Sequence, residues 1–89
     1  MTGDGGIVMA GSDWQQLFDM KGWVKDGTLI KPDQKVVVLF RGEAEEDLRH
    51  ATEVTDTFLV FDHTVHGYLA YHRWDDIVGV RESRRSAAE

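Results

Sequence analysis

Four histidines are the residues whose spacing first suggests chemistry: His50, His63, His66 and His72. His63 and His66 are three residues apart in a predicted turn, and His50 can approach His72 in a folded β-structure. Imidazole is a good zinc ligand, but a structural zinc site needs four converging ligands, and the chain has no cysteine. We therefore expect no metal and no other cofactor. Because histidine titrates near neutral pH, a pH response is a minor hypothesis.

The carboxylates gather in an acidic stretch, residues 42–47, with the sequence Gly-Glu-Ala-Glu-Glu-Asp. Paired carboxylates can act as general acid and base. This stretch, however, lies at a predicted hairpin tip, where we expect solvated carboxylates, and its spacing does not match a Ca²⁺ loop. Asp75, Asp76 and His72 form a second acid–base group, without a nucleophile motif and with little room for a concave site. We expect no catalytic residues and a protein that is not an enzyme.

The length and composition predict one small domain. A chain of 89 residues buries only part of its unfolded surface, so its core is thin and it gains stability from partners. The absence of cysteine excludes disulfides and fits a reducing cytoplasm. The apolar runs are far shorter than the roughly 20 residues of a membrane span. The N-terminus lacks the basic start of a signal peptide. We therefore expect a cytoplasmic protein with no membrane partner.

The charge is acidic overall but unevenly distributed. The formal net charge of −6 weighs against generic nucleic-acid binding, which needs Lys and Arg to neutralise phosphates. Residues 21–41 contain five basic and two acidic residues, whereas residues 42–62 contain seven acidic and one basic residue. The chain therefore has either two solvated surfaces or an assembly with faces of opposite sign.

Local signals predict an N-terminal helix over residues 12–21. Ser12 is a favourable N-cap, and Gln15 three residues later completes a capping box. Gly22 is typical of the residue that follows a helix. Three apolar residues at positions i, i+3 and i+4 form one stripe that would cover the core: Trp14, Leu17 and Phe18.

The remaining chain predicts a β-meander. Asp26-Gly27 between short β-prone pieces indicates a tight hairpin. Residues 48–62 are β-prone but too long for one flat strand, so we expect a bend near residues 55–56. Further strands are expected at 35–41, 68–72 and 77–80, with a tight corner at 73–76. We therefore predict a domain over residues 12–80, between a flexible N-terminus (1–11) and a flexible charged tail (81–89).

Residues 56–80 resemble a known family. Arg-Trp-Asp-Asp-Ile-Val-Gly-Val at 73–80 is similar to the second Sm motif, in which a basic residue, a tight corner and a short strand close a barrel. Asp56-Thr57-Phe58-Leu59-Val60 resembles the Asp-Gln-Phe-Val-Val segment of the RNA chaperone Hfq, and Tyr71-His72-Arg73 falls where Hfq has Tyr-Lys-His. The chain thus resembles a divergent member of the Sm-like (LSm/Hfq) superfamily.

The resemblance implies a mostly β fold: a small, five-stranded, strongly bent Sm/SH3-like antiparallel barrel with an N-terminal α-helix. It also implies a homo-oligomeric ring of about five to seven copies, closed by pairing of edge strands. The implied function is that of a non-catalytic, RNA-binding or RNA-associated scaffold. By position, Phe58 and Tyr71 would stack the bases of single-stranded RNA. Thr57, His72 and Arg73 would contact base edges, sugar or phosphate.

An alternative interpretation is an SH3-like protein-interaction or structural module of phage or mobile-element origin, without nucleic-acid binding. The acidic balance favours it, as do departures from the family pattern. Trp74 stands where the Sm motif usually has glycine, and residues 22–34 have no clear counterpart. Trp74 could be an exposed anchor for an unknown protein partner, because Trp is enriched at interface hot spots, or it could be buried against the helix.

Overall fold

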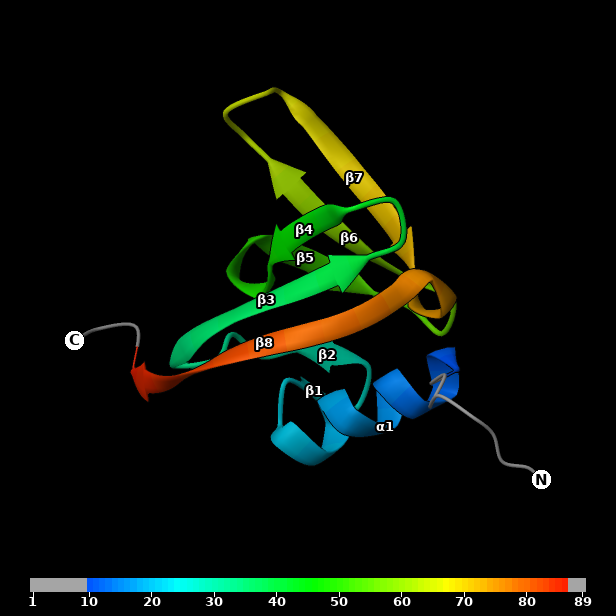
Figure 1. Ribbon diagram of the computed structural model, residues 1–89, viewed down its shortest axis with the longest axis vertical. Coiled ribbons are helices and arrows are strands. Elements are labelled where there is room, and N and C mark those ends of the chain that lie inside the picture. The colour runs from blue at the N-terminus through cyan, green and yellow to red at the C-terminus, as the bar shows by residue number, and fades with distance from the viewer. Residues whose placement is uncertain (1–9, 87–89) are drawn as a thin grey trace.

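The computed structural model describes residues 10–86 as one N-terminal helix and eight strands in three antiparallel sheets (Figure 1). The elements are α1 (Gly11–Lys21), β1 (Val24–Lys25), β2 (Thr28–Leu29), β3 (Gln34–Phe40), β4 (Ala44–Asp47), the 3₁₀ turn η1 (Leu48–His50), β5 (Ala51–Val54), β6 (Phe58–His63), β7 (Tyr68–Arg73), the 3₁₀ turn η2 (Trp74–Asp76) and β8 (Ile77–Ser86). The mostly β class with an N-terminal helix is therefore confirmed. Within residues 10–86 no sheet closes on itself, and no helix is long and apolar enough to cross a membrane.

The three sheets have simple orders. The hairpin β1–β2 stands alone, the second sheet has the order β4–β3–β8, and the third has the order β5–β6–β7. Figure 1 shows α1 and the β1–β2 hairpin at one end of the molecule, and the β6–β7 hairpin projecting at the other. The predicted hairpin at Asp26-Gly27 is confirmed, because both residues have the positive φ that a tight primed turn requires, 53° and 76°.

The predicted helix is confirmed, but its first residue and its cap differ. Ala10, not Ser12, is the N-cap residue. The Asp13 side chain accepts a hydrogen bond from the Ala10 N–H at 3.0 Å. The Gly11 N–H donates to Asp75 Oδ1 at 2.9 Å. This tertiary bond satisfies one of the free N–H groups of the first turn, so the helix starts one residue earlier than the local pattern predicts. Gly22 follows the helix with φ 80°, as expected.

The apolar stripe of α1 packs on an aromatic cluster. The Phe18 ring is fully buried and makes edge contacts with Trp23 at 5.2 Å and with Trp74 at 5.0 Å between centroids. Trp74 is only 3% exposed, and its Nε1–H donates to the Thr55 carbonyl at 2.7 Å. Trp74 is therefore a core residue, and the exposed-anchor hypothesis is wrong. Burial follows because the η2 corner turns the indole under the helix.

The interior lies between the second and third sheets. Residues Val36, Val38 and Phe40 alternate inward along β3, and Leu59 and Phe61 do so along β6. The rest of the buried cluster comes from the helix and the residues after it, from the 3₁₀ turns and from the first residues of β5 and β8: Trp14, Phe18, Trp23, Leu48, Ala51, Trp74 and Ile77.

The bend between the two sheets does not lie where the sequence predicted it. The chain bends at η1 (Leu48–His50), where Leu48 is buried and Asp47 accepts a hydrogen bond from the Arg49 N–H. Residues 55–57 instead form the turn between β5 and β6. The Thr55 hydroxyl accepts hydrogen bonds from the N–H groups of Thr57 and Phe58, which favours reversal over extension.

The last strand is longer than predicted. β8 continues through Ser86, so residues 81–86, expected as a charged tail, belong to a strand. Of the predicted flexible segment 1–11, Gly11 belongs to α1 instead, while residues 1–9, like residues 87–89, lie outside the described range. The extension pairs with the start of β3, where Gln34 opposes Ser86. Glu82 adds a salt bridge to Lys21 at the end of α1, with 2.8 Å between Nζ and Oε1. Long-range partners therefore order a locally polar segment.

We predict that Glu82 contributes to stability only above acidic pH. The hydrogen bond from Lys21 and a second from Gln34 hold the pKa of Glu82 below its ordinary value of 4.5. The unfolded chain therefore binds a proton more readily, and this contribution is present above pH 4.5 and is lost as the pH falls through the lowered pKa. Because the pair is partly exposed, its size is below about 1 kcal/mol. Urea unfolding at several pH values should show a smaller acid-induced loss for Glu82→Gln than for wild type; an identical loss contradicts the prediction.

Candidate functional site

Three of the five residues predicted to bind RNA lie on one outer face of the third sheet. Phe58 opposes Arg73 across β6 and β7, and Val60 opposes Tyr71. Opposed residues project on the same side of a sheet. The alternating residue Leu59 points into the core, so Phe58, Tyr71 and Arg73 point outward. We call these three residues the aromatic platform.

The aromatic platform combines two rings and one cation. The Phe58 and Tyr71 rings are 5.7 Å apart and inclined by 65°. Tyr71 is 62% exposed, so most of its side chain is accessible to a ligand. Arg73 Nη2 lies 3.3 Å from Asp75 Oδ2, and both side chains are exposed. Thr57 is exposed in the turn before β6, and its carbonyl accepts a hydrogen bond from the backbone N–H of Trp74 at 3.0 Å.

His72 is not part of the aromatic platform, because it lies on the opposite, inner face of β7. Its ring stacks on Phe40, with 4.0 Å between centroids and 14° between planes. Its Nε2 lies 2.8 Å from Glu46 Oε2. The structure therefore separates His72 from the other predicted RNA contacts.

A buried carboxylate joins two histidines on this inner face. His63 Nε2 lies 2.8 Å from Glu46 Oε1 and 2.9 Å from Oε2, so Glu46 accepts from both His63 and His72. Glu46 is only 6% exposed. We call Glu46, His63 and His72 the Glu46 cluster. It was not predicted, and the expectation that the carboxylates of residues 42–47 are all solvated is wrong for Glu46.

A period-2 pattern could have indicated this burial. Residues 44–47 form strand β4 rather than a turn, and the turn is confined to residues 41–43. Ala44, Glu46 and Leu48 alternate along the chain, and Glu46 opposes Val38, whose side chain is in the core. Alternation with Leu48 thus places Glu46 inward.

The described histidines and carboxylates do not form a metal site. Across residues 10–86, no group of three or more such side chains has an arrangement that could hold a metal ion. His63 and His66, the pair with the most suggestive spacing, have ring centroids 6.2 Å apart, and each ring lies beside Tyr68.

Within the described residues, β7 and β8 are edge strands of their sheets, as β4 and β5 are on the other sides. β7 is hydrogen-bonded only to β6, and β8 only to β3. Figure 1 shows the two strands diverging from η2. Large apolar side chains are exposed along them and at the hairpin tip: Val65, Tyr68, Leu69, Tyr71 and Val78. An unpaired edge flanked by exposed apolar side chains is a template for pairing with another strand.

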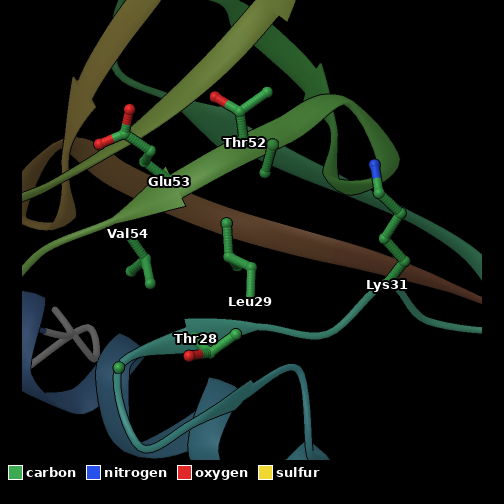
Figure 2. A pocket seen from close by; sticks show the side chains of 8 residues that line it. Thr28, Leu29, Lys31, Thr52, Glu53 and Val54 are labelled. Atoms are coloured by element: carbon green, nitrogen blue, oxygen red, sulfur yellow. The ribbon is translucent and has the colours of Figure 1, made fainter.

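A groove of about 570 Å³ lies between β2 and β5. Figure 2 shows Leu29 of β2 and Val54 of β5 pointing toward each other, with Lys31 and Glu53 near opposite ends. The Lys31 ammonium donates to the Arg49 carbonyl. A smaller hollow of about 280 Å³ shares Gly27 and Val54 with this groove. The groove can hold an apolar or extended ligand.

No family model, curated protein or solved structure matches this chain.

The chemistry of the site therefore has to come from the geometry alone. The described residues offer a partly exposed aromatic pair with one arginine, the open edges of β7 and β8, an apolar groove and a buried Glu–His cluster. The first three are features of binding and assembly surfaces. The fourth lies inside the molecule and reaches the platform only through strand β7.

Proposed function

We propose that this protein is a non-catalytic, self-assembling module of the Sm-like kind that binds single-stranded RNA on the aromatic platform. One observation carries the proposal: Phe58, Tyr71 and Arg73 share an outer face of a sheet whose edge strand β7 has one unpaired edge. Aromatic faces stack unpaired bases without needing a specific sequence.

The finer fold assignment is part of this proposal. β4 and β5 are consecutive around η1 and belong to different sheets. Taken as one strand bent at η1, they give five strands in the order β8, β3, β4–β5, β6 and β7. The second and third sheets would then share this bent strand, as in a small Sm/SH3-like barrel. This interpretation leaves β7 and β8 as the open borders.

Those borders support assembly into a ring. We propose that β7 of one copy pairs with β8 of the next, which would cover Leu69 and Val78 at the junctions and leave Tyr71 open on the outer face. Each copy carries one β7 edge and one β8 edge, so the contact between copies is head-to-tail. Repeated head-to-tail contacts form a ring when the rotation from one copy to the next returns to the first copy. A small domain with a thin core gains stability from these neighbours.

The charges around the aromatic platform limit the electrostatic contribution to RNA binding. Arg73 is the one cation of the platform, and Asp75 partly neutralises it. Glu53 opposes Val60 in the sheet, so it lies on the same outer face. Binding should therefore depend mainly on stacking and only weakly on salt. With one arginine engaged per copy, log Kd should rise with log salt concentration with a slope near 0.7.

Filter binding with U-rich and A-rich oligoribonucleotides tests this function. Tyr71→Ala should weaken binding by about 5- to 150-fold, because one base–ring stack contributes about 1–3 kcal/mol. Arg73→Ala should weaken it less and flatten the salt dependence. Tyr68→Ala is the matched control, since Tyr68 is a half-exposed tyrosine on the inner face of the same strand, where it lies beside His63. No binding by wild type at low salt would remove the RNA proposal.

The second candidate is an SH3-like protein-interaction module that binds no RNA. The apolar groove between β2 and β5 favours it, because an extended peptide could place apolar side chains over Leu29 and Val54. NMR shift mapping with the same oligoribonucleotides separates the two functions. Changes at Tyr71 support the platform, and the absence of any shift with RNA favours the groove.

A further inference from the structure

The Glu46 cluster connects the two sheets that form the interior. Glu46 lies on β4 of one sheet, while His63 lies on β6 and His72 on β7 of the other. His72 opposes Leu59, and His63 opposes Tyr68 at the far end of the β6–β7 hairpin. The pair Phe61–Ala70 lies between these two rows. Glu46 therefore holds the hairpin at two points separated along its length.

Because Glu46 bonds to the hairpin at two points, it can prevent the hairpin from rotating relative to β4, which a single bond could not do. Beyond Phe61, where the pairing with β5 ends, the β6–β7 hairpin is a two-stranded ribbon that projects past the second sheet (Figure 1), and such a ribbon twists easily. Stacking fixes the direction of both imidazoles: His72 lies flat on Phe40 at 4.0 Å, and His63 on Tyr68 at 4.9 Å. Their Nε2 atoms consequently converge on one carboxylate.

The carboxylate of Glu46 also determines which ring nitrogen of each histidine carries a hydrogen. An ionised carboxylate only accepts hydrogen bonds, so both His63 and His72 must carry a hydrogen on Nε2. Other titratable groups beside the cluster are Tyr68 on β7 and His66 in the turn, both next to His63, while β3 contributes the uncharged Phe40. Among the described residues, the hydrogen bonds and ion pairs of Glu46 are with His63 and His72.

Stability alone does not account for such an arrangement. Replacing a buried ionic group by well-packed apolar side chains is often neutral or stabilising, whereas directional bonds can restrict a structure to one conformation. The neighbours of Glu46 on its face, Ala44 and Leu48, are apolar. A leucine at position 46 would continue their pattern.

We infer that the Glu46 cluster positions strand β7, so that its free edge and Tyr71 are presented in one orientation for assembly and binding. The role of this orientation in assembly and binding rests on the proposed function, whereas the restraint that the cluster places on β7 is independent of it. His72 is adjacent to both Tyr71 and Arg73 in the strand, so its attachment to Glu46 sets the twist of the residues that form the platform. Loss of the cluster would leave the domain folded with a loosened β7.

Two variants and a matched control test this inference. Glu46→Gln keeps the shape of the side chain but replaces one acceptor oxygen by an N–H₂ donor, so the imidazole that faces this donor must move its ring hydrogen to Nδ1. Nitrogen-detected NMR should report Nε2–H on both rings in wild type and a changed tautomer for one ring in the variant. Amide exchange in β7, relative to β3, should be roughly ten-fold faster. Glu45→Gln, on the opposite face of the same strand, should change neither quantity.

The triple variant Glu46→Leu, His63→Leu, His72→Phe separates positioning from stability. We expect it to unfold at the wild-type urea concentration or higher, and still to show about ten-fold faster exchange in β7 and about ten-fold weaker self-association. Wild-type exchange in β7 of the triple variant would overturn the inference, as would equal exchange in Glu46→Gln and Glu45→Gln. A monomeric wild type would contradict the proposed assembly instead, while the tautomer and exchange results would still decide the inference.

Discussion

Phe18→Ala is expected to lower the free energy of unfolding by about 3–5 kcal/mol, because truncation of a buried aromatic leaves a cavity that its neighbours cannot fill. Phe18 is fully buried and contacts both Trp23 and Trp74 through ring edges. An 89-residue domain is stable by only about 4–13 kcal/mol. The melting temperature should therefore fall by more than about 12 °C, measured by tryptophan fluorescence on heating.

Met20→Ala is the control for this substitution. Met20 lies on the same helix and is largely exposed, so its truncation should change stability by less than about 0.5 kcal/mol. A loss below about 1 kcal/mol for Phe18→Ala would mean that α1 does not cover the core. The bond from Gly11 to Asp75 and the salt bridge from Lys21 to Glu82 attach the two ends of the same helix. Loss of Phe18 should thus unfold the domain rather than release the helix alone.

The double variant Leu69→Lys, Val78→Lys is expected to weaken self-association by about 100-fold or more. Leu69 and Val78 are 48% and 59% exposed on the free strands β7 and β8. In the proposed junction both would be buried, and each buried apolar side chain contributes about 1.5–3 kcal/mol. Lysine on an edge strand also opposes pairing. Sedimentation equilibrium in the micromolar range measures the effect.

Met20→Lys, Ile30→Lys is the charge-matched control for the edge variant. Both residues are exposed apolar side chains outside β7 and β8, and the change in net charge is the same. The control should associate like wild type. Equal weakening by both double variants would indicate general charge repulsion, and unchanged association of the edge variant would contradict pairing of β7 with β8.

Short-range signals predicted much of the fold. The helix, the glycine after it and the Asp26-Gly27 hairpin were predicted correctly, because each depends on residues within one turn of each other. The strands around residues 35–41 and 68–72 were also placed correctly, since their β-prone composition and turn residues define them locally.

The candidate site was predictable only in part. Phe58, Tyr71 and Arg73 share a face because the register of β6 and β7 follows from a short hairpin. His72 was expected beside them, although the alternation of a strand places it on the other face. Trp74 was open to two interpretations, because its burial depends on how η2 meets α1.

By itself the sequence determined the elements whose causes are local: the helix, the tight turns and the alternation of the hairpin strands. Only the tertiary structure decided the bend at η1, the length of β8 and the meeting of Glu46 with His63 and His72. Glu46 meets His63 and His72, which lie 17 and 26 residues later in the chain. The salt bridge between Lys21 and Glu82 joins residues 61 positions apart. Contacts over such separations form only when the whole chain is packed, so the residue types that take part carry no local mark of them.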